Sequence, residues 1–258
     1  QPSVPPGDYD SDYTFDGNIG ALSEKYESRG NPGVIGFDTT GGWSYGKYQL
    51  AAKTGSLNEF HSWLKRAHPD MEAQLSAAGG ASAGRAGTEA YKAWVQVLGT
   101  EAGGAVQSEY AGLQYFVPGA NRIKKGAGLD VMARAFTVQQ MAFSTAIQHG
   151  NGGASSVFRN ALKGLGYPPN AVTETNPTDA ALIRAVYAER RSGNGARYFK
   201  KSTQGVRNSV VDRFHNEEAD ALRSLEQEIK KAQENPPKAE PGDNSAATQT
   251  VSPHRGAA

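Results

Sequence analysis

Cysteine is absent from the 258 residues. The chain therefore forms no disulfide and has no thiol for nucleophilic catalysis or metal binding, which excludes the cysteine peptidases. Long apolar runs are also missing, and no basic segment followed by an apolar one occurs near the beginning. We therefore expect neither a membrane span nor a signal peptide.

Excess charge of one sign is missing as well. Lysine and arginine number 27 and aspartate and glutamate 26, a balance that is not typical of a nucleic-acid-binding protein. The histidines are scattered and form no H-E-x-x-H motif, so we expect no metal site; they are His61, His68, His149, His215 and His254. P-loop and dinucleotide fingerprints are absent too, and we expect no cofactor.

One segment satisfies the spacing of a serine-hydrolase motif. G-W-S-Y-G at 42–46 fits G-x-S-x-G. That motif requires a preceding strand and an α/β alternation after it, and neither is indicated here. We therefore do not expect a serine hydrolase.

Composition divides the chain into three parts. Residues 1–15 are rich in Pro, Asp and Ser and indicate a linker, and residues 235–258 indicate a disordered tail. Between them, 16–234 is expected to form one domain. Helical spacing of apolar residues predicts helices over 16–27, 56–75, 88–98, 102–116, 129–148, 155–165, 179–191 and 205–234, with one hairpin near 37–49. The predicted class is α+β and mostly helical, with a small β-hairpin lobe.

The first helix ends in an acid. Ile19, Leu22 and Tyr26 define its apolar stripe, and Glu27 falls at the edge of this stripe, within a turn of the Gly30 that ends the helix. An acid is unfavourable at the C-terminal end of a helix dipole, and the dipole together with partial burial favours its protonated form. A neutral carboxylic acid is what protonation of a glycosidic oxygen requires. Glu27 is therefore the first catalytic candidate.

A glycine-rich segment follows this helix. Asp38 lies eleven residues after Glu27 and is a candidate second carboxylate, although an Asp before two threonines also suits a turn. Hydroxyl, amide and aromatic groups that suit a sugar follow it. These candidate binding residues are Ser44, Tyr45, Tyr48 and Gln49.

These motifs resemble the lysozyme-like superfamily of peptidoglycan-cleaving enzymes. E-S-R-G at 27–30 followed by S-Y-G-K-Y-Q at 44–49 is similar to the signature of goose-type lysozymes and lytic transglycosylases. The run S-Y-G-K-Y-Q-L-A-A-K-T-G is similar to lysozyme domains of phage tail proteins and type VI secretion effectors. F-S-T-A-I-Q-H-G at 143–150 resembles a core segment of those domains. Ser44 stands where phage lysozymes have a threonine, and the gap to Asp38 is longer than in those enzymes.

The resemblance implies a two-lobed lysozyme-like fold that cleaves between N-acetylmuramic acid and N-acetylglucosamine, with Glu27 as general acid and Asp38 as assisting carboxylate. It also implies a monomeric antibacterial effector or phage tail lysin. Such a protein acts in the periplasm or cell wall of a target bacterium, with a secretion carrier and an immunity protein as partners. Hydrolysis and anhydro-forming transglycosylation both remain open. A non-catalytic glycan-binding or tail-structural module is the alternative, and a chitosanase-like enzyme is disfavoured by the balanced charge.

The predicted helix 129–148 is apolar on almost every side, which predicts burial at the centre of the larger lobe. Gln148 and His149 follow at its end, before Gly150. They are candidate substrate-contacting groups, although a histidine at a helix C-terminus is also common because of the dipole.

Overall fold

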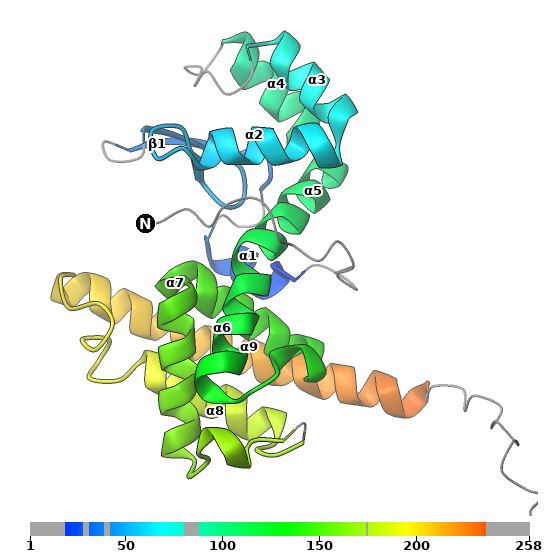
Figure 1. Cartoon of the computed structure of the whole chain (residues 1–258). Helices are drawn as coiled ribbons and strands as arrows, with labels where there is room; N and C mark the ends of the chain where they lie inside the picture. Colours follow the sequence, from blue (N-terminus) through cyan, green and yellow to red (C-terminus); the bar gives the residue numbers. More distant parts are fainter. Residues whose placement is uncertain (1–18, 28–30, 39–41, 80–87, 174, 236–258) are drawn as a thin grey trace, which may run out of the picture.

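The computed structural model describes residues 19–27, 31–38, 42–79, 88–173 and 175–235 (Figure 1). The side chains of Glu24, Tyr26, Glu27, Asp38 and Asn170 lie outside the described part. The predicted linker 1–15 and almost all of the predicted tail also lie outside it. No helix among the described residues is long and apolar enough to cross a membrane.

A short helix and a small sheet begin the described part. Helix α1 (Ala21–Glu27) leads to strands β1 (Ile35–Asp38), β2 (Gly42–Tyr45) and β3 (Leu50–Ala51). The strands pair antiparallel in the order β1-β2-β3, with Asp38 opposite Gly42 and Tyr45 opposite Leu50. The hairpin predicted over 37–49 is therefore present, but it begins two residues earlier and a third short strand extends it.

Four helices pack together with this sheet to form the upper lobe of Figure 1. They are α2 (Ser56–Ala67), α3 (Pro69–Ala77), α4 (Glu89–Leu98) and α5 (Glu101–Ala111). Thr88 and Thr100 cap α4 and α5, each accepting a hydrogen bond from a backbone N–H in the first turn. The single helix predicted over 56–75 was wrong, because Pro69 keeps His68 out of the helical region and splits it into α2 and α3.

The lower lobe consists of the later helices together with α1. After a π-helical turn η1 (Gly112–Phe116), the chain continues as α6 (Val117–Ala127), a 3₁₀ turn η2 (Val131–Ala133), α7 (Phe136–Gly164), a 3₁₀ turn η3 (Pro169–Ala171), α8 (Asp179–Arg190) and α9 (Gln204–Glu234). Figure 1 shows α9 crossing the middle of this lobe, above α8, and extending beyond it to one side.

The predicted first and last residues of two helices in this lobe were wrong. The helix predicted over 129–148 begins only at Phe136, because Asp130 caps the 3₁₀ turn before it and Glu228 accepts hydrogen bonds from the N–H groups of Phe136 and Thr137. It also continues through the predicted 155–165 helix, with a kink at Gly150 (φ 69°, ψ 166°) in place of an end. Helix α6 was not predicted; Pro118 stands in its first turn, where a proline is tolerated.

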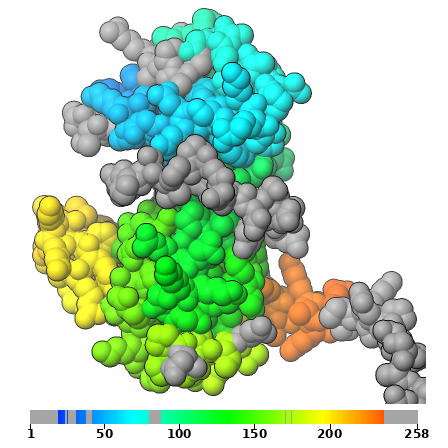
Figure 2. Space-filling model, in the orientation of Figure 1, coloured from blue at the N-terminus to red at the C-terminus, as the bar shows by residue number. Residues whose placement is uncertain are grey.

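Each lobe has its own hydrophobic core. The upper core contains Tyr45, Phe60, Trp94 and Tyr110, and the lower core contains Phe116, Phe143, Phe158, Tyr187 and Phe214. Leu22 of α1 packs into the lower core although the sheet that follows belongs to the upper one. Figure 2 shows the two bodies one above the other, and η1 lies where the long helical segment passes between the cores. The fold is therefore α+β and mostly helical, as predicted.

Candidate functional site

The chain passes from the lower to the upper lobe just after α1. The carbonyl oxygen of Pro32 accepts hydrogen bonds from Trp94 Nε1 at 3.2 Å and from Gln107 Nε2 at 3.1 Å. Gln107 is fully buried, and its Oε1 accepts a hydrogen bond from the N–H of Lys47 at 2.9 Å. One buried amide therefore fixes the segment that follows α1 against the turn between β2 and β3.

That turn needs glycine at one position. Gly46 has φ +73°, and a Cβ there would lie 2.0 Å from Gln107 Oε1. Next to it, Ser44 Oγ donates to Gln49 Oε1 at 2.9 Å, and Gln49 Nε2 donates to the Gly46 carbonyl at 3.1 Å. Two of the predicted binding residues, Ser44 and Gln49, are therefore brought together beside the turn, with Gln49 exposed and Ser44 buried.

Tyr48 connects the two lobes. Its ring lies edge to face with Phe143 of the lower core, with 5.9 Å between ring centroids, and its hydroxyl donates to Ser108 Oγ of α5 at 3.3 Å. Lys47, buried beside it, donates from Nζ to the same Ser108 oxygen at 3.2 Å. Tyr45 is placed differently: it is 3% exposed and packs against Trp94 in the upper core. Little of the Tyr45 ring is available to a ligand.

Glu27 and Asp38, the two predicted catalytic residues, each end an element. Glu27 is the last residue of α1 and Asp38 the last residue of β1, while both side chains lie outside the described part. The structure thus places their backbones at two element ends and leaves their catalytic roles as predictions.

Helix α9 runs alongside α1. Lys25 is paired with Asp220, and a pocket of about 290 Å³ continues from this pair toward Ala21 on α1 and Gln227 on α9. Both helices line this pocket, to which Gln140 of α7 also contributes. Arg213 precedes Asp220 by seven residues, which is two helical turns, so the two residues lie on the same face of α9.

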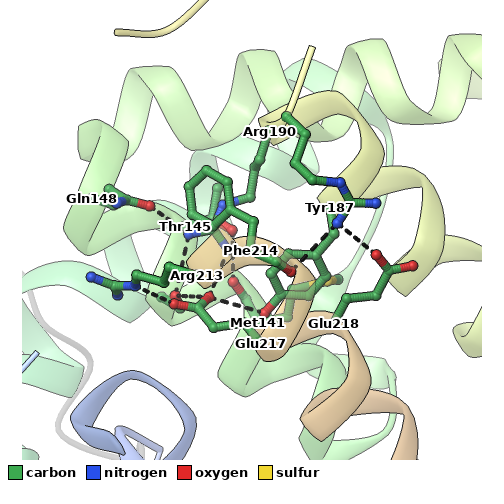
Figure 3. A network of polar contacts seen from close by, with 11 residues as sticks. Met141, Thr145, Gln148, Tyr187, Arg190, Arg213, Phe214, Glu217 and Glu218 are labelled. Carbon is green, nitrogen blue, oxygen red and sulfur yellow. Dashed lines mark hydrogen bonds and ion pairs between the residues drawn. The ribbon is translucent and has the colours of Figure 1, made fainter. Parts of the chain in front are cut away.

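A buried charge cluster occupies this part of α9 (Figure 3). Arg190 and Glu217 have no exposed side-chain surface, and their Nη1 and Oε2 atoms are 3.2 Å apart. The other oxygen of Glu217 accepts from Arg213 Nε at 2.5 Å, while Ser144 and Tyr187 also donate to Glu217. In Figure 3 Arg213 forms the outer end of the cluster, on the side of α1.

The predicted residues Gln148 and His149 belong to this cluster. Gln148 Oε1 accepts from Arg190 Nη2 at 2.6 Å, so its amide oxygen is already bound to protein. His149 packs between Tyr198, Phe199 and Phe214. Burial, and then the charges of Arg190 and Arg213, lower the pKa of His149 to about 3. The ring is therefore neutral at physiological pH and is not a proton donor there.

The sequence pattern did not lead us to the cluster, although a signal was present. Arg190 continues the apolar stripe that Leu182, Val186 and Tyr187 form on α8, and Glu217 lies on the stripe of Phe214 and Ala221. A charge at a buried position of a stripe requires a buried partner of opposite charge. The two stripes, taken together, would have indicated the pair.

No group of three or more His, Asp or Glu side chains suited to a metal ion occurs within the described ranges.

The sequence of this chain was compared with known proteins and protein families. No curated protein matches the chain. A family model described as type VI secretion system spike protein VgrG3-like, C-terminal, matches residues 19–218. This match begins just before α1 and ends within α9, so it includes both lobes, their junction and the charge cluster. The chain belongs to the VgrG3-like C-terminal family of type VI secretion system spike proteins.

Proposed function

We propose that this domain cleaves the glycan strand of peptidoglycan, with Glu27 as the general acid. The observation that carries the proposal is the position of Glu27 at the C-terminal end of α1, where the chain passes between the two lobes. An acid there opposes the helix dipole, which costs stability and favours the protonated form. Donation of that proton to the glycosidic oxygen is the first step of glycoside cleavage.

The neighbouring elements support a sugar-binding role for the junction. Gln49 is exposed on the turn that Gly46 and Gln107 fix, and Ser44 holds its amide oxygen. Gln49 Nε2 uses one N–H on the Gly46 carbonyl, and its second N–H suits hydrogen bonding to sugar hydroxyl and N-acetyl groups. Asp38, at the end of β1, is the proposed assisting carboxylate.

Membership of a secretion-spike family supports an antibacterial role for this cleavage. A domain carried by the spike would be delivered to the periplasm of a target bacterium, where peptidoglycan lies. A producing cell would then need an immunity protein that blocks the site. Delivery to the periplasm and immunity are both proposed here as consequences of the proposed activity.

The test is digestion of purified peptidoglycan, followed by mass spectrometry of the released fragments. Wild-type protein is compared with Glu27→Gln and Asp38→Asn, and Glu24→Gln on the same helix is the matched control. We expect Glu27→Gln to lose at least about 100-fold in rate, the lower range for general acid catalysis, and Glu24→Gln to retain activity. Undiminished cleavage by Glu27→Gln would refute the assignment.

The same fragments distinguish the open alternatives. Hydrated reducing ends indicate hydrolysis, and products lighter by one water indicate an anhydro-forming transglycosylase. Binding of the wild-type protein to sacculi without any release would indicate a non-catalytic module.

A further inference from the structure

A pocket of about 400 Å³ lies in the lower lobe, between the last turns of α6 and α7 and the segment that follows α7. This volume is within the range of ligand-binding sites in proteins, roughly 300–1,000 Å³. Helix α6 begins directly after η1, and its 11 residues span about 16 Å. The pocket is therefore well separated from the junction of the lobes. Its apolar lining consists of Ala127, Leu162, Tyr167, Pro168 and Pro169.

The walls of this pocket are fixed by backbone contacts. Gly166 has φ +83°, which turns the chain at the end of α7, and the N–H of Tyr167 then donates to the carbonyl of Leu162 at 2.9 Å. Gly128, with φ +72°, ends α6, and a Cβ there would lie 2.1 Å from the carbonyl oxygen of Pro169. The segment after α7 therefore packs directly on the end of α6, and the pocket exists before any ligand arrives.

The charge around the pocket has one sign, in a chain whose total charge is balanced. The segments 117–128 and 150–173 contain no Asp or Glu, and their basic residues are Arg122, Lys124, Lys125, Arg159 and Lys163. Lys124 is paired with Asp130, which follows the first segment. Arg159 and Lys163 stand one turn apart on α7, are exposed and line the pocket. Within the described ranges, no hydrogen bond or ion pair involves the side chain of either residue.

We propose that this pocket binds an acidic segment of a partner protein, which inserts one aliphatic or aromatic side chain and places its carboxylates on Arg159 and Lys163. Arginine can bind a carboxylate with two parallel hydrogen bonds, and lysine adds a mobile point charge. A purely apolar ligand would leave both cations unused, and a purely anionic one would leave the apolar lining empty. Charge complementarity and the lining together therefore select a segment that has both.

The position of the pocket has a consequence for such a complex. Because the pocket lies at the end of α6 away from η1, a partner bound there leaves the junction of the lobes open. This partner differs in that respect from an inhibitor that covers the proposed catalytic site. The inference does not depend on the proposed function, and its tests measure binding.

The first test is an NMR titration of the full chain, labelled with nitrogen-15, with two acetylated and amidated peptides, Asp-Glu-Leu-Glu-Asp and Asp-Glu-Phe-Glu-Asp. We expect saturable shifts at the amides of Ala127 and of residues 159–167, for at least one peptide. The same peptides with glycine at the centre, or with lysine in place of every acid, are expected to give no saturable shift at these positions. Absence of such shifts with both acidic peptides would overturn the proposal.

The second test uses the double variant Arg159→Gln/Lys163→Gln. We expect it to bind the acidic peptide about fivefold more weakly, the effect of losing two solvent-accessible ion pairs. Lys200→Gln/Lys201→Gln is the matched control, because it removes two exposed cations from the segment between α8 and α9. The control is expected to bind as the wild type does. Equal weakening in both double variants would show non-specific attraction and would also overturn the proposal.

The cell wall is the competing source of such a ligand, since the stem peptides of peptidoglycan also carry carboxylates and small apolar side chains. Wild-type protein and Arg159→Gln/Lys163→Gln are therefore compared for binding to purified sacculi. We expect equal binding. Loss of sacculus binding in the double variant, without pocket shifts from the acidic peptides, would identify a wall-binding site and refute the protein partner. Failure of the proposed cleavage would leave the peptide result unchanged.

Discussion

Replacing Glu217 with glutamine removes the carboxylate that Arg190 and Arg213 share. The carbonyl oxygen of the new side-chain amide can still accept hydrogen bonds, but its NH2 group brings two N–H donors to a carboxylate site to which arginines, Ser144 and Tyr187 already donate. Arg190 has no exposed side-chain surface and keeps Gln148 as a neutral partner. Breaking a buried ion pair by removing one partner costs about 3–5 kcal/mol. For a chain of this size that corresponds to a decrease in Tm of roughly 6–20 °C.

Glu218→Gln is the matched control, on the next residue of the same helix. Glu218 is paired with Arg191 at 2.6 Å, with both side chains partly exposed, and Arg191 also donates to the carbonyl of Phe214. Water and this carbonyl can satisfy Arg191 after the change, so we expect a loss of only about 1 kcal/mol, the upper part of the range for solvent-accessible pairs.

The assay is urea denaturation of both variants and the wild type, followed by circular dichroism and by tryptophan fluorescence, together with a thermal scan. Equal losses in the two variants would refute the reasoning, because burial of the charge would then have no separate cost. A Glu217→Gln protein as stable as the wild type would refute it more directly.

Two further predictions concern the junction and the lower lobe. Gly46→Ala should destabilise the protein by roughly 2 kcal/mol more than Gly55→Ala, because both positions have positive φ but only at Gly46 would the new Cβ meet Gln107 Oε1 and break a buried hydrogen bond; equal losses in chemical denaturation would contradict this. His149 has a pKa of about 3 in the fold and an ordinary value of 6.5, so the unfolded chain binds more protons between these limits. Stability should therefore decrease as pH falls through this window, by roughly 1.4 kcal/mol per pH unit, and His149→Phe should flatten that decrease in urea titrations; an unchanged slope would count against a neutral buried ring.

The helices with a clear apolar stripe and a threonine cap were predictable from the sequence. Helix α4 after Thr88, α8 after Thr178 and α9 after Thr203 begin within a residue or two of the predicted positions. The errors occurred where tertiary contacts decide the limits. Glu228, 92 residues away from Phe136, determines where α7 begins, and no local pattern contains that information.

The candidate site was predictable only in part. The glycine and hydroxyl pattern located the turn at Gly46 and the Ser44–Gln49 pair, because these contacts are local in sequence. Gln107, which fixes the turn, and Trp94, which binds the segment after α1, come from helices far along the chain. Tyr45 was predicted to bind a ligand but alternates with Ser44 along β2, and strand geometry directs it into the upper core.

The placement of α1 in the lower core also has a consequence for the order of folding. This helix has seven residues, too few to persist alone, and its neighbours are α7 and α9. The upper core is built from residues 45–110, so it can form while the later helices are still being synthesised. Helix α1 can pack in its final position only once these later helices are present. The end of α1, where the proposed acid Glu27 stands, can therefore pack against α9 only after α9 has been made, and a chain that stops before Asp220 would lack the Lys25–Asp220 pair.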